Sequence, residues 1–138
     1  MKYKNGILAG AFDLIHPGYI RMFKDAKSSC ERLTVALHSD PTVERPHKMK
    51  PIQTVDERIE ILEAIKYIDD IKVYTLEEEF LSLLKSNVYD VRYLGSDYKN
   101  IPYSGKDLPI KIEWIERNHH YSTTDLKNKI CMAVIRRW

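Results

Sequence analysis

Short apolar runs alternate with longer amphipathic stretches along the chain. Five such runs predict strands, at residues 7–9, 33–37, 71–74, 91–94 and 110–115. The intervening stretches predict helices, at residues 17–29, from 54 onward, at 76–86 and at 122–136. This alternation is typical of an α/β protein with a mostly parallel sheet flanked by helices. We therefore predict a single α/β domain over residues 1–138, with a five-stranded sheet.

Three predicted helices have recognisable starts. Pro17 suits a first helical position, and Thr54 with Glu57 three residues later forms a capping box. The Ser-Thr-Thr-Asp run that begins at Ser122 has the same capping chemistry. Two irregular segments, 39–53 and 96–109, each follow the carboxyl end of a predicted strand. Open α/β sheets bind their ligands at that edge, so we expect the site there.

Charge and composition narrow the class of protein. The formal net charge is +2 over 138 residues, with acids and bases mixed, so we expect no nucleic-acid partner. No apolar run has the length of a signal peptide core or a membrane span, so we expect a soluble, cytoplasmic protein without a membrane partner. The five histidines follow no recognised ligand spacing, so no metal site built from protein ligands is expected.

The segment GAFDLIHPGY, residues 10–19, carries the strongest chemical signal. It joins the first strand to the first helix, where free helix N–H groups attract phosphate. Gly10 and Gly18 allow the backbone to approach a ligand closely. Asp13 could hold a metal ion or orient a base, and His16 could donate a hydrogen bond or carry positive charge.

This segment resembles the GxFDxxHxGH signature of the cytidylyltransferase superfamily, and within it that of the glycerol-3-phosphate cytidylyltransferases. The resemblance continues through Arg58, through Leu94-Gly95-Ser96-Asp97-Tyr98, and through Arg117 with the Tyr121-Ser122-Thr123-Thr124 run. It implies a Rossmann-like nucleotidyltransferase fold. It also implies a homodimer and a magnesium ion that arrives with the nucleotide.

The chain departs from the family pattern at three positions. Tyr19 stands where the family has its second histidine, Ala11 where it has a threonine, and His120 where it has a glycine. Tyrosine donates one hydrogen bond but stays neutral near pH 7. His119 and His120, close to Arg117 in the sequence, could supply the missing positive charge.

The resemblance implies a role for each matching residue. The catalytic set is His16, Tyr19, Lys48 and Arg117. The nucleotide-binding set is Gly10, Ala11, Phe12, Asp13, Gly18, Lys50, Gly95, Asp97, Tyr121, Ser122, Thr123 and Thr124. The acceptor-binding set is Arg58, Lys66, Asp69 and Tyr98.

The implied reaction transfers CMP from CTP to a small phosphorylated acceptor, glycerol 3-phosphate or a related phosphomonoester, and releases pyrophosphate. One alternative is an adenylyltransferase that uses ATP and a sugar phosphate, because residues 94–99 resemble that branch as well. The other alternative is a nucleotide-binding module without catalysis, because Tyr19 replaces a histidine.

Overall fold

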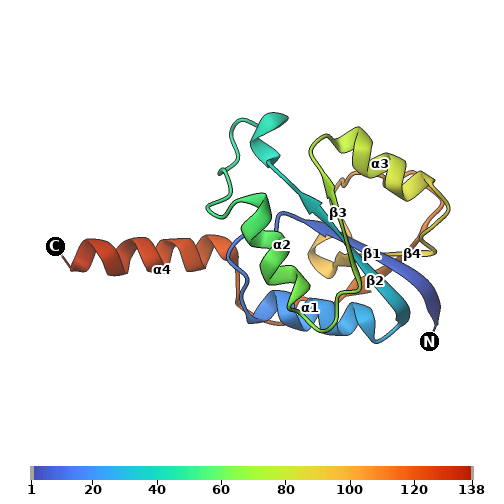
Figure 1. The fold of residues 1–138 in the computed structure, drawn as a ribbon, viewed down its shortest axis with the longest axis horizontal. Helices are drawn as coiled ribbons and strands as arrows, with labels where there is room; N and C mark the ends of the chain where they lie inside the picture. Colours follow the sequence, from blue (N-terminus) through green and yellow to red (C-terminus); the bar gives the residue numbers. More distant parts are fainter. Residues whose placement is uncertain (1, 138) are drawn as a thin grey trace.

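A single parallel sheet forms the centre of the protein. The computed structural model describes residues 2–137, whose five strands pair in the order β3-β2-β1-β4-β5 (Figure 1). All four pairings are parallel. The strands are β1 (Tyr3–Gly10), β2 (Cys30–His38), β3 (Asp70–Tyr74), β4 (Val91–Gly95) and β5 (Lys111–Ile115). The predicted α/β class and strand number are confirmed.

The helices follow the predicted alternation. They are α1 (Pro17–Lys27), α2 (Val55–Glu63), α3 (Glu77–Lys85) and α4 (Thr123–Arg136), with 3-10 turns η1 (Pro41–Val43) and η2 (Ser96–Tyr98). Thr54 and Glu57 form the expected capping box. However, α2 ends at Glu63, so Ile65 and Ile68 pack on the core from the following turn instead of from the helix.

The helices cover both faces of the sheet. Phe23 of α1 and Leu62 of α2 belong to the apolar core on one face, and Phe80 and Leu84 of α3 belong to the core on the other. The chain changes face between β3 and β4, and it places β4 beside β1. Such a reversal of strand order opens a crevice at the carboxyl ends of the two central strands, here β1 and β4.

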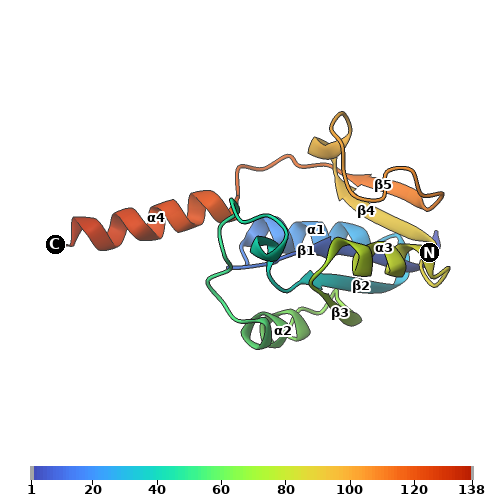
Figure 2. The same ribbon diagram turned by 90° about the horizontal axis from the view of Figure 1, so that it is seen from above.

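Helix α4 differs from the other three. It projects from the domain as an isolated rod in both ribbon views (Figures 1 and 2), and it has no buried residue. Its second half exposes the apolar residues Ile130, Met132, Val134 and Ile135. Within residues 2–137, no helix is both long and apolar enough to cross a membrane.

Candidate active site

A large cleft lies where the sequence predicts the site, at the carboxyl edge of the sheet. Its volume is about 830 Å³. The end of β1, the start of α1, the end of β4 and the segment before α4 all contribute to its walls. It includes these predicted site residues: Gly10, Ala11, Phe12, His16, Gly18, Tyr19, Gly95, Asp97, Tyr98, Arg117, Tyr121, Ser122 and Thr123.

His16 caps the N-terminus of α1 and faces this cleft. Its Nδ1 accepts a hydrogen bond from the Gly18 N–H at 3.1 Å, so in the neutral ring the proton resides on Nε2. Burial lowers the pKa of His16, and electrostatic interaction with the nearby His119 and Arg117 lowers it further. Near pH 7 the ring is therefore a neutral donor through Nε2. The Tyr19 ring stacks on it at 4.2 Å between centroids.

His119 completes a pair of imidazoles around Gly18. A Cβ atom on Gly18 would lie 2.5 Å from His119 Cε1 and 2.9 Å from His16 Cε1, so a larger residue would displace at least one of the two rings. His119 Nδ1 accepts the Tyr121 N–H at 3.1 Å, which leaves Nε2 as its donor in the neutral ring too. The sequence suggested His119 and His120 together, but only His119 lines the cleft; His120 is exposed.

Tyr19 links α1 to the start of α4. Its hydroxyl lies 2.9 Å from Thr123 Oγ1, and Thr123 in turn donates to the Asp13 carbonyl oxygen at 3.2 Å. Tyr19 therefore holds the threonine of the Ser-Thr-Thr run in place.

Arg117 lies beside η2. Its guanidinium is 3.4 Å from the Asp97 carboxylate and donates to the Tyr121 carbonyl oxygen at 3.2 Å. Arg117 and Asp97 are each 45% exposed at the side chain, so an incoming anion can compete for the guanidinium. Ser122 caps α4 by accepting the Asp125 N–H at 3.0 Å, whereas Thr124 is exposed and lies outside the cleft walls. The helix start thus presents N–H groups and hydroxyls next to a cation, an arrangement that suits phosphate.

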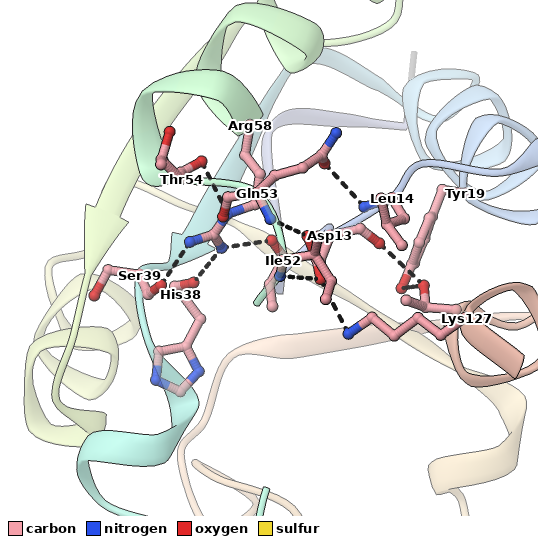
Figure 3. A network of polar contacts seen from close by, with 12 residues as sticks. Asp13, Leu14, Tyr19, His38, Ser39, Ile52, Gln53, Thr54, Arg58 and Lys127 are labelled. Atoms are coloured by element: carbon pink, nitrogen blue, oxygen red, sulfur yellow. Dashed lines mark hydrogen bonds and ion pairs between the residues drawn. The ribbon is translucent and has the colours of Figure 1, made fainter. Parts of the chain in front are cut away.

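The Asp13 carboxylate, for which the sequence suggests a contact with nucleotide or metal, is bound by other parts of the protein. Figure 3 shows its buried carboxylate among donors of the protein: the Ile52 N–H at 2.8 Å, the Gln53 N–H at 2.9 Å and Lys127 Nζ at 3.0 Å. Burial by itself would raise the pKa of Asp13, but these three donors outweigh it, and the pKa is lowered.

Arg58, which the resemblance assigns to acceptor binding, is likewise internal. It is 2% exposed, and every hydrogen bond that it makes goes to a backbone carbonyl (Figure 3). The acceptors are the carbonyl oxygens of Ala11, His38, Ser39, Gln53 and Thr54, at 2.6–3.3 Å. Arg58 joins the ends of β1 and β2 to the start of α2.

Lys66 and Asp69, which the resemblance also assigns to acceptor binding, do not line the cleft. Lys66 is exposed in the turn after α2, and Asp69 directly precedes β3, at the amino edge of the sheet opposite the cleft. The Asp69 carboxylate accepts the Leu33 N–H at 2.8 Å and pairs with Lys27 at 2.6 Å. Of the four predicted acceptor residues, Tyr98 lines the cleft.

Lys48 and Lys50 lie outside the cleft walls. Both are exposed in the segment between η1 and α2, and Lys50 Nζ approaches Asp40 at 4.0 Å.

The sequence is similar to a known protein family and to several of its members. The family model described as cytidylyltransferase-like matches residues 7–130. The FAD synthase of Pyrococcus horikoshii is 34% identical over 112 residues, which cover 81% of this chain and 74% of the synthase. The bifunctional protein HldE of Hyphomonas neptunium is 32% identical over 106 residues, which cover 76% of this chain but 22% of HldE.

Two solved structures share the fold. The lipopolysaccharide core biosynthesis protein of Thermoplasma volcanium superposes with a TM-score of 0.66 at 20% identity, covering 86% of this chain and 98% of that one. The pantoate-beta-alanine ligase of Francisella tularensis gives 0.62 at 20% identity, covering 98% and 72%. The chain belongs to the cytidylyltransferase-like family.

Proposed function

We propose that this protein transfers a nucleoside monophosphate from a nucleoside triphosphate to the phosphate group of a small acceptor, and releases pyrophosphate. The observation that carries the proposal is one cleft that unites the His16–His119 pair, Arg117 and the N-terminus of α4. Each of these groups is a donor or cation suited to phosphate oxygens.

In the proposed reaction, a phosphate oxygen of the acceptor attacks the α-phosphorus of the nucleotide in line. A new P–O bond forms, the bond from the α-phosphorus to the bridging oxygen breaks, and pyrophosphate leaves with the bonding electron pair. The protein needs to form no covalent intermediate. Its contribution is to position the two substrates and to stabilise charge on the phosphates.

The two imidazoles face the reacting phosphate in this proposal. Nε2–H of His16 and Nε2–H of His119 would donate to oxygens of the α-phosphate and to the bridging oxygen. Two donors fixed on either side of Gly18 need little reorganisation during the reaction, because both rings are already held by backbone N–H groups. The alternative of a module without catalysis was based on the histidine missing at Tyr19, and the presence of His119 as a second imidazole favours the enzyme instead.

Arg117, Ser122 and Thr123 would hold the β- and γ-phosphates at the start of α4. Arg117 would exchange its exposed pairing with Asp97 for the phosphates, which leaves Asp97 beside the nucleotide. Lys48 and Lys50 would reach the phosphates only if the exposed segment before α2 moves toward the cleft.

Magnesium fits this site as a companion of the nucleotide. The Asp13 carboxylate is occupied by protein donors, so phosphate oxygens and water would supply most ligands. When bound, the ion neutralises charge on the phosphates.

The donor nucleotide has two candidates. The sequence motifs favour CTP, as in glycerol-3-phosphate cytidylyltransferases. The relationship to an FAD synthase favours ATP, because FAD contains an AMP unit. We propose ATP as the more strongly supported donor and retain CTP as the second candidate. The acceptors to compare are glycerol 3-phosphate, a sugar phosphate and riboflavin 5′-phosphate.

A pyrophosphate-release assay tests this proposal. CTP and ATP are offered in parallel with magnesium and each acceptor, and omission of the acceptor serves as the blank. Acceptor-dependent release with one nucleotide supports the transfer and identifies both substrates. Tight nucleotide binding without release for any acceptor in the panel supports the module without catalysis.

A further inference from the structure

Arg92 is a buried cation at the part of the cleft that faces α3. It lies on β4, is 5% exposed, and lines the cleft. None of the ion pairs among residues 2–137 involves it. Of its five N–H groups, one donates to a described residue, the Ser104 carbonyl oxygen in the segment between η2 and β5. The remaining donors have no partner within that part of the protein.

Aromatic rings surround this guanidinium. The Phe80 ring lies 5.0 Å from its central carbon and the Tyr103 ring 5.4 Å, distances at which a cation is attracted to a ring face. Tyr74 and Tyr98 line the same cleft. Burial lowers the pKa of Arg92, and the nearby tyrosines oppose that shift. The rings thus form apolar walls around a planar cation.

Two acids that line the same cleft, Glu44 and Glu77, have other hydrogen-bond partners. Glu77 accepts a hydrogen bond from the Ser104 hydroxyl, and Glu44 accepts the Glu77 N–H at 2.8 Å. Burying a guanidinium without an anion is unfavourable, and the hydrogen bond to the Ser104 carbonyl oxygen uses only one of its donors. A planar fork of free donors in an open cleft matches the oxygens of a phosphate or carboxylate.

We propose that Arg92 binds an anionic group of the acceptor, and that Tyr74, Phe80, Tyr98 and Tyr103 contact a flat, unsaturated ring next to that group. The proposal rests on the proposed function and narrows its substrate. The acceptor is then a phosphomonoester with a planar body instead of a simple polyol phosphate. In this proposal Arg117 binds the nucleotide and Arg92 binds the acceptor.

Calorimetric titration with phenyl phosphate and with glycerol 3-phosphate tests this assignment. The wild-type protein is expected to bind phenyl phosphate more tightly. Arg92→Met keeps an unbranched apolar chain between the rings but removes the charge, and it should weaken phenyl phosphate binding by about tenfold or more while nucleotide affinity is unchanged. The matched control Arg117→Ala should weaken nucleotide binding and leave phenyl phosphate binding unchanged.

Three results would overturn the assignment: no phenyl phosphate binding by the wild type, wild-type affinity in Arg92→Met, or parallel loss of both ligands in that variant. Equal affinity of the wild type for phenyl phosphate and glycerol 3-phosphate would refute the proposed contact between the aromatic side chains and a flat ring of the acceptor. If Arg92→Met fails to melt cooperatively, Arg92→Lys makes the same test, because it keeps the charge and loses the planar fork. If the wild-type protein does not bind nucleotide, that result would instead count against the proposed function.

Discussion

The imidazole pair at Gly18 joins two segments about a hundred residues apart in the sequence. His16 comes from the motif before α1, and His119 from the segment before α4. The sequence identified His16 directly, because its motif is contiguous. It identified His119 only as one of two neighbouring histidines, since the direction of each ring depends on how the segment turns. The structure separates them: one lines the cleft and the other is exposed.

His119→Ala should lower kcat by about tenfold or more, because a fixed donor to the reacting phosphate is lost. His120→Ala is the matched control and should keep nearly wild-type kcat. Adding Tyr19→His to His119→Ala should restore part of the loss, since it returns an imidazole to the same wall. Equal effects of the two alanine variants in steady-state kinetics would exclude a specific role for His119.

His16→Ala should have a larger effect, about 100-fold or more in kcat, with the nucleotide dissociation constant changed much less. Single-turnover kinetics with direct nucleotide titration would separate the two quantities. A variant that loses binding and turnover to the same extent would show that His16 contributes to ground-state affinity alone.

At the scale of elements, the segment between β2 and α2 is fixed by two buried charged side chains. Arg58 binds carbonyl oxygens of three segments, and Asp13 accepts N–H groups at residues 52 and 53. The motif match suggested ligand contacts for both. Their partners are other parts of the same chain, and most of those contacts depend on the folded path of the backbone, which the sequence pattern does not specify. The helix caps were predictable, because each depends on residues three positions apart.

Arg58→Ala should destabilise the fold by about 3 kcal/mol or more, because it leaves several inward-facing carbonyl oxygens without a donor. Lys66→Ala, an exposed site on the same part of the chain, should change the unfolding free energy by about 0.5 kcal/mol or less. Urea unfolding measures both. A small effect of Arg58→Ala would mean that water or other donors replace the guanidinium.

The lowered pKa of Asp13 also predicts a pH dependence of stability. A carboxyl whose pKa is lower in the folded state than in the unfolded state stabilises the fold at pH values above the unfolded-state pKa, which is near 4 for aspartate. This contribution is lost as the pH falls through the folded-state pKa. Asp13→Asn should therefore lower the melting temperature at pH 7 and have a smaller effect near pH 3. An equal loss at both pH values would contradict an ionised Asp13.

At the scale of the whole molecule, the parallel sheet and the location of the cleft followed from the sequence. When short strands alternate with helices along a chain, few sheet topologies are possible. Ligands bind at the carboxyl edge of such sheets, which is where the cleft lies. The projection of α4 was not predictable, because its capping signal fixes where the helix starts and not what it packs against.

The homodimer implied by the family resemblance remains a prediction. Light scattering of the purified protein should give twice the chain mass of 16.2 kDa. A mass of one chain across the accessible concentration range would contradict it.

The central claim is that the nucleotide is cleaved between its α- and β-phosphates and that the α-phosphate passes to the acceptor. The most direct test supplies the preferred nucleotide labelled with ³²P either at the α- or at the γ-position, together with its acceptor. We predict that α-label appears in a product whose mass equals the acceptor plus a nucleoside monophosphate, and that γ-label appears only in pyrophosphate. Transfer of the γ-label to the acceptor, or release of α-label as free nucleoside monophosphate alone, would contradict the account.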